Sequence, residues 1–118
     1  MPSSTITFSN TTLHNLYKVL TGADVTGVSV VHAFPASTAG NALRPSCRRL
    51  SLQADPGNGG TNILVGDENI TSANGQVLQQ GVAKEYSPSG AESSSTSLLD
   101  KYVLATGAGK LNVEWEYN

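Results

Sequence analysis

Apolar and polar residues alternate along most of this chain with a period of two, which is typical of β-strands with one buried face. The alternation begins at residues 5–8, gives way once to a helical pattern, and resumes beyond Gly22. Glycine, asparagine and proline separate the alternating segments and favour turns between them. We therefore predict a mainly all-β, antiparallel fold, either a β-sandwich or a jelly-roll-like barrel, with one short N-terminal helix.

The helical pattern covers residues 12–20, where leucines recur at helical spacing. Thr11 or Thr12 can cap the first turn of this helix, and Gly22 can end it. We expect it to be the only helix of the chain.

The 118 residues are enough for one domain and too few for two independent cores. Within that domain, we predict that residues 1–24, the first strand and the helix, form a docking arm, because chain termini often become ordered only on docking. Residues 25–118 are predicted to form the β-sandwich core.

Turn signals divide the rest of the chain into strands. The strongest is the Asp-Pro-Gly-Asn-Gly-Gly run at 55–60, and the Asn-Gly pair at 74–75 favours a hairpin turn. The serine-rich residues 87–97 lack apolar periodicity and are expected to form an exposed loop. The predicted strands are 5–8, 28–33, 46–54, 61–66 with a short continuation at 70–71, an edge strand at 83–86, 102–105 and 111–117.

The surface is expected to be lightly charged. Charged residues make up 14% of the chain, with 7 Lys and Arg against 9 Asp and Glu, which gives a net charge of -2. This is too little charge of either sign to drive binding to nucleic acid or to anionic lipid. The chain also lacks a signal-peptide pattern and a long apolar run, so we expect a soluble protein with no nucleic-acid and no membrane partner.

Few residues could carry catalysis. The only two histidines, His14 and His32, lie in no catalytic motif, and we interpret them as a solvated helix residue and a satisfied strand residue. Cys47 lies beside two arginines that could lower its pKa, but inert packing is the favoured interpretation. Because zinc-ligand spacing is missing as well, we predict no enzyme activity, no cofactor and no metal site.

Two weaker candidates remain for chemistry. The turns at 55–58 and 67–69 contain the oxygen ligands that calcium prefers, although turns are rich in these residue types in any case. Glu114 and Glu116 lie on one face of the last strand, where paired carboxylates could serve in acid–base catalysis. We interpret the two glutamates as a solvated face.

The strand and turn order from residue 48 onward resembles that of small β-rich virion structural proteins of tailed bacteriophages. The segments that carry the resemblance are 49–56, 63–70, 74–78, 98–105 and 109–117. The resemblance implies a capsid cement or decoration protein that stabilises contacts between major capsid subunits, or else a head–tail or tail component. It also implies a protein that is soluble in the host cytoplasm before assembly and then lies on the capsid surface. Its partners would be the major capsid protein or neighbouring virion subunits, and a homo-oligomer is expected, with a trimer favoured.

Four residues are predicted to bind the partner: Ile6 and Phe8 near the amino end, and Trp115 and Tyr117 near the carboxyl end. Because aromatic rings can stack on sugars, Trp115 and Tyr117 also motivate an alternative, a carbohydrate- or receptor-binding β-sandwich module. A small enzyme on a cupin-like barrel is a third hypothesis, and it would need clustered histidine ligands.

Overall fold

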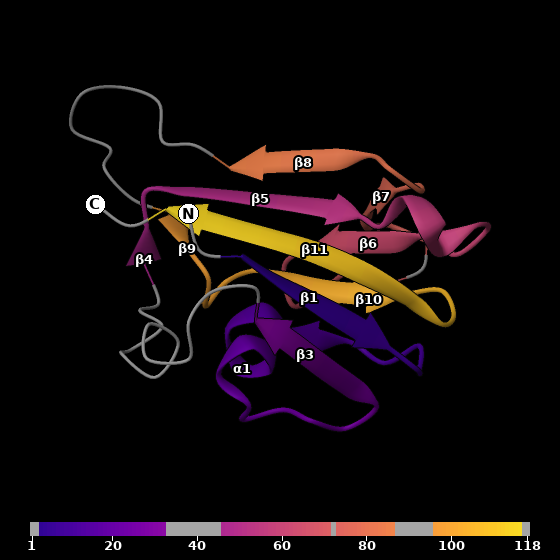
Figure 1. Cartoon of the computed structure of the whole chain (residues 1–118), viewed down its shortest axis with the longest axis horizontal. Coiled ribbons are helices and arrows are strands. Elements are labelled where there is room, and N and C mark those ends of the chain that lie inside the picture. The colour runs from indigo at the N-terminus through magenta and orange to yellow at the C-terminus, as the bar shows by residue number, and fades with distance from the viewer. Residues whose placement is uncertain (1–2, 33–45, 72, 87–95, 117–118) are drawn as a thin grey trace.

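The computed structural model describes residues 3–32, 46–71, 73–86 and 96–116 (Figure 1). Its strands form a five-stranded sheet, a four-stranded sheet and a pair of short strands, and every strand pairing among the described residues is antiparallel. The prediction of an antiparallel all-β fold with one short N-terminal helix is therefore confirmed.

The larger sheet contains, in spatial order, β3 (Val28–His32), β1 (Ser3–Phe8), β11 (Gly109–Glu116), β5 (Arg49–Ala54) and β8 (Ala83–Tyr86). The smaller sheet contains β2 (His14–Asn15), β10 (Tyr102–Ala105), β6 (Ile63–Gly66) and β7 (Gln76–Leu78). In Figure 1 the five strands run from β8 at the top to β3 at the bottom. The edge strand predicted at 83–86 is found there as β8.

Alternation along the strands produces the core, because successive side chains of a strand point to opposite faces of its sheet. In β11 the buried positions are Leu111, Val113 and Trp115, and the positions between them are partly or fully exposed. One hydrophobic cluster joins such residues from both sheets with leucines and a valine of the helix. Each large apolar side chain buried in this way stabilises the fold by roughly 1.5–3 kcal/mol.

The N-terminal strand lies inside the larger sheet. Register places Ile6 of β1 between Leu111 of β11 and Val30 of β3. Ile6 and Phe8 are 0% and 1% exposed. Residues 3–8 are therefore part of the core, and the structure does not separate them as a docking arm.

The helix begins later than predicted. It spans Leu16–Thr21 as α1, whereas the leucine pattern indicated 12–20. His14 and Asn15 instead form β2, which pairs with the first residues of β10. This pairing takes up the backbone that the sequence pattern assigned to the first helical turn.

The caps of α1 agree with the prediction at one end only. The Oδ1 atom of Asn15 accepts a hydrogen bond from the backbone N–H of Lys18 at 3.1 Å, so the predicted caps Thr11 and Thr12 are wrong. Gly22 ends the helix as predicted, with a φ of 82° that favours glycine.

The predicted strand 46–54 is divided at Arg48. Residues Ser46–Cys47 form β4, which pairs with β9 (Thr96–Ser97), while β5 pairs with β11 and β8. The last two residues of the predicted serine-rich loop are thus a strand, and residues 87–95 lie outside the described part. The bend also changes the face of Cys47, which alternation placed with exposed positions and which is 1% exposed.

Turns connect the remaining strands. The run at 55–60 contains a short 3-10 helix, Pro56–Asn58, with Asp55 as its cap. The connection between β6 and β7 is longer than a two-residue hairpin turn, and Ile70 and Thr71 are not in a strand. β3 ends at His32, and the rest of the strand predicted over 28–33 falls outside the described residues.

Candidate interaction surface

The solvent side of the five-stranded sheet carries hydroxyl, amide and charged side chains. It consists of the positions that alternate with the buried ones, and we call it the outer face. Its members are Ser3, Thr5, Thr7, Ser29, Val31, Arg49, Ser51, Gln53, Ala83, Glu85, Lys110, Asn112, Glu114 and Glu116. Hydroxyl and amide groups interact across its strands, as when Thr5 Oγ1 donates a hydrogen bond to Asn112 Oδ1 at 3.1 Å.

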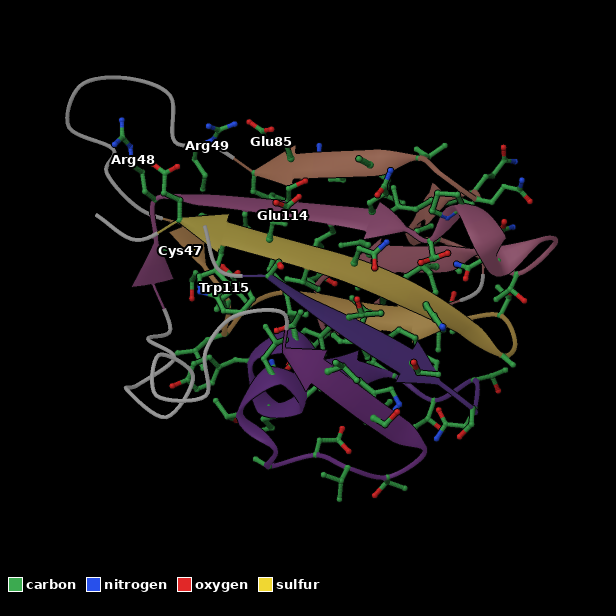
Figure 2. The ribbon with its side chains drawn as sticks, in the orientation of Figure 1. Cys47, Arg48, Arg49, Glu85, Glu114 and Trp115 are labelled. Carbon is green, nitrogen blue, oxygen red and sulfur yellow. The ribbon has the colours of Figure 1, made fainter. Side chains whose placement is uncertain are left out.

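Charges gather at one end of the outer face, where β5 begins and β11 ends (Figure 2). Arg49 Nη2 lies 3.0 Å from Glu85 Oε1, and Arg48 Nη1 lies 3.6 Å from Glu116 Oε1. All four side chains are at least 38% exposed, so water and salt screen both pairs. Such exposed pairs contribute about 0–1 kcal/mol each and leave the charges available to a partner.

The two glutamates considered for acid–base chemistry have different neighbours. Glu114 is exposed on β11 between Ser3 and Ser51, whereas Glu116 is engaged by Arg48. A general acid or base needs a group to act on in a concave site, and this face is a strand surface. Their interpretation as a solvated face fits this placement.

Cys47 is packed in the core. Figure 2 shows it below the charged end, in the same region as Trp115. Burial raises the pKa of the Cys47 thiol to about 11, and the charge of Lys101 only partly opposes this effect. Because the thiolate is the reactive form, the structure favours inert packing over a nucleophile activated by the neighbouring arginines.

His14 is the largest departure from the sequence interpretation. It was expected to be solvated on the helix, but it is 2% exposed and lies in β2. Its Nδ1 atom lies 2.7 Å from Asp24 Oδ2 and its Nε2 atom lies 3.1 Å from Asn10 Oδ1. Because Asn10 Nδ2 donates to the carbonyl of Thr26 at 3.1 Å, the Asn10 oxygen faces the ring.

Asp24 is held in this cluster as a carboxylate. The hydrogen bond from His14 lowers the pKa of Asp24 below its ordinary value of 3.8, against a smaller opposing effect of burial. The Asp24 Oδ1 atom also accepts from the backbone N–H of Thr26 at 3.2 Å. The bonds from His14 to Asp24 and from Asn10 to Thr26 join β2 and the segment before it to the loop before β3.

The oxygen-rich turns use their carboxylates locally. Asp55 Oδ1 accepts from the N–H of Gly57 at 2.8 Å, and this bond, followed by one from Asn112, lowers the pKa of Asp55. Asp67 Oδ1 likewise accepts from the N–H of Asn69 at 2.8 Å. Within the described ranges, no three His, Cys, Asp or Glu side chains come together in a group that could hold a metal ion.

Three of the four predicted partner-binding residues are core residues. Ile6, Phe8 and Trp115 are at most 1% exposed, and Tyr117 lies outside the described residues. The three buried side chains are not accessible to a partner in this fold, and partner binding through Tyr117 stays a prediction.

Sequence reasoning missed the exposed apolar residues beside β3. Val25 and Val31 are each 69% exposed, more than any other large hydrophobic residue in the described part. The alternation in this strand indicated that both faces are at least partly covered, whereas Ser29 and Val31 on the outer face are exposed. The signal in the sequence is a run of valines without a charge, Val-Ser-Val-Val at 28–31.

No helix among the described residues combines the length and the apolar character that crossing a membrane would take. No family model, no curated protein and no solved structure matches the chain.

Proposed function

We propose that the chain is a structural protein of a bacteriophage virion, of the capsid cement or decoration type, which acts by non-covalent contacts between subunits. The proposal starts from the resemblance of segments 49–56, 63–70, 74–78, 98–105 and 109–117 to such proteins. The outer face is the observation that carries it. A cement protein needs a broad surface that stays soluble before assembly and then binds its neighbours without chemistry.

The chemistry of the outer face suits this task. Hydroxyl and amide groups form hydrogen bonds with a partner, and burying them costs less than burying unpaired charges. The sheet holds these groups in a fixed geometry, because the alternate positions of the same strands are anchored in the core. The exposed pairs at the charged end add directional contacts at the rim of such a surface.

The carbohydrate-binding alternative is less well supported. It relied on Trp115 and Tyr117 as a stacking platform, and Trp115 is 1% exposed in the core. A buried ring cannot stack on a sugar. The cupin-like enzyme is also less well supported, because His14 is occupied by Asp24 and Asn10.

The test is mass spectrometry of intact particles purified from phage lysates. We expect the chain in stoichiometric amounts relative to the major capsid protein. If it is abundant in the lysate but absent from purified particles, the virion role is wrong.

A substitution on the outer face makes this test sharper. Ser51 lies on that face in β5, opposite Glu114 and Glu85, so Ser51→Arg adds a bulky side chain whose charge is tolerated there. We expect the variant to fold and to be incorporated much less than the wild type. The matched control is Gln76→Arg on exposed β7 of the other sheet, which should be incorporated normally. Equal incorporation of both variants would remove the outer face from the contact.

A further inference from the structure

The two edges of the five-stranded sheet differ in chemistry. β8 is one edge and contains Lys84 and Glu85, whereas β3 is the other edge and contains three valines, a serine and a histidine. Edge strands of soluble proteins usually carry charges, prolines or bulges that prevent pairing with other chains. β8 has this protection. β3 has five regularly paired residues and none of these features.

The two most exposed large hydrophobic side chains of the described residues lie at this edge, because Val25 and Val31 are each 69% exposed. A hollow of about 230 Å³ lies between α1 and β3, on the inner side of the sheet, and its lining includes Leu20, Val28, Val30 and the acidic residue Asp24. Val25 lines this hollow as well, whereas Val31 lies on the outer side of β3. The open edge of β3 with these side chains on its two sides forms one continuous surface.

We infer that this surface binds a second copy of the same chain, with β3 of one copy pairing antiparallel with β3 of the other and extending the sheet across a two-fold axis. The register follows from the faces of the strand. Residues opposite each other in a continuous sheet must lie on the same face, so paired positions differ by an even number. Centring the pair on Val30 places Ser29 opposite the Val31 of the second copy and pairs all five residues of β3.

The same rule disfavours pairing through β8. In a β8–β8 pair, each side chain must stay on its own face of the sheet. Only two such registers bring three of the four residues of β8 into pairs, and these registers are centred on Lys84 or on Glu85. Either register places a charge directly opposite its own copy, which is destabilising. β3 meets no such repulsion, so self-pairing selects β3 over β8. The edges of the smaller sheet, β2 and β7, have only two and three residues and offer fewer backbone hydrogen bonds.

A second copy also covers the hollow. An antiparallel pair across a two-fold axis brings the same region of both chains to the axis, because the interface is self-complementary. The helix–strand hollows of the two copies then flank the paired strands. The two-fold contact closes after two copies, so it predicts a dimer and not the trimer that the phage resemblance implies.

The test is sedimentation equilibrium of the purified chain up to about 1 mM, the dissociation constant of a weak complex. We expect a concentration-dependent mass that approaches twice the chain mass of 12.3 kDa. A chain that stays monomeric over this range, or that forms a trimer, overturns the inference.

Charge-swap variants test the register itself. Ser29 and Val31 are exposed on the outer face, so substituting them should leave the core intact, which circular dichroism checks. The double variant Ser29→Lys/Val31→Lys places like charges opposite each other twice and should weaken the dimer roughly tenfold or more. The double variant Ser29→Glu/Val31→Glu should do the same, and mixing the two variants should restore dimers. Dimers of undiminished strength in either variant, or no recovery on mixing, contradict the pairing.

The matched control is Ala83→Lys/Glu85→Lys, at equivalent exposed positions on β8, and it should dimerise like the wild type. Loss of the dimer in this variant would place the contact at β8 and overturn the inference. The experiment needs no phage particle. Its failure would therefore leave the virion role untouched, and absence from particles would leave the dimer untouched.

Discussion

The buried pair of His14 and Asp24 makes a strong prediction about stability. Asp24→Asn keeps the size of the side chain and removes its charge, while His14 remains 2% exposed between Asn10 and the new amide. The amide oxygen carries no full negative charge, so a hydrogen bond that it accepts from the ring is weaker than one to the carboxylate. The variant should therefore fold into the same structure and be less stable than the wild type at neutral pH.

The geometry sets the size of this loss. A hydrogen bond to a charged group contributes about 1.5–3 kcal/mol, and a distance of 2.7 Å between Nδ1 and Oδ2 is at the strong end for such a bond. The Asp24 side chain is 25% exposed, so water screens part of the interaction. We expect a loss of about 1–2 kcal/mol in the free energy of unfolding, which lowers the melting temperature of a domain of this size by several degrees.

The pKa of Asp24 determines how the stability difference between wild type and Asp24→Asn changes with pH. The pKa of Asp24 is lower in the folded chain than its ordinary value of 3.8. Because the carboxyl pKa is lower in the folded state, the ionised carboxylate stabilises that state. This stabilisation is complete at pH values above the pKa of the unfolded chain, and it is lost as the pH falls through the pKa of the folded chain. The stability difference between wild type and Asp24→Asn should be largest above about pH 4 and should shrink steadily in more acidic solution.

Urea denaturation followed by circular dichroism from pH 2 to 7 measures this difference. Asp100→Asn is the matched control, because Asp100 is 69% exposed and its loss should change the stability by less than about 0.5 kcal/mol. A double-mutant cycle with His14→Ala should give a coupling energy of about 1 kcal/mol or more. A coupling energy near zero, or a stability difference that grows below pH 4, would refute the stabilising contact between His14 and the Asp24 carboxylate.

Two further predictions concern the buried residues below the charged end. Trp115→Ala should cost about 3–5 kcal/mol and leave much of the chain unfolded at 37 °C, measured by thermal denaturation, whereas a Trp115→Ala protein as stable as wild type would exclude the core role. Cys47 should react slowly with thiol reagents at pH 8 and quickly in urea, because burial raises its pKa to about 11. Fast labelling of the native protein would contradict the packing.

The pattern of neighbouring residues was sufficient to predict a strand wherever alternate residues of that strand are buried. The last strand was predicted from Leu111, Val113 and Trp115 because its period is complete within a few residues. Residues 83–86 were predicted as an edge strand, and they form β8 at one edge of the larger sheet. Glycine and proline located the turns because their backbone preferences are intrinsic.

Prediction failed where a distant partner decides the local structure. Leu13 and Leu16 fit a helix, but the backbone at 14–15 pairs with residues 102–103. The sequence near the helix gives no information about that contact, because the partner residues lie far along the chain. The environment of His14 depends in the same way on two flanking loops, which meet only when β1 and β3 have paired.

The burial of the predicted partner-binding residues directs the search for a contact surface to the other side of the same strand. Ile6 and Phe8 were selected as apolar residues near a terminus, and the sheet buries them because β1 lies between β3 and β11. Strand geometry then places their neighbours Thr5 and Thr7 on the opposite side, toward solvent. The proposed contact surface is therefore displaced by one residue along the strand, from apolar to hydroxyl side chains. Among the described residues, the two most exposed large apolar side chains, Val25 and Val31, lie beside and within β3, where the sheet ends.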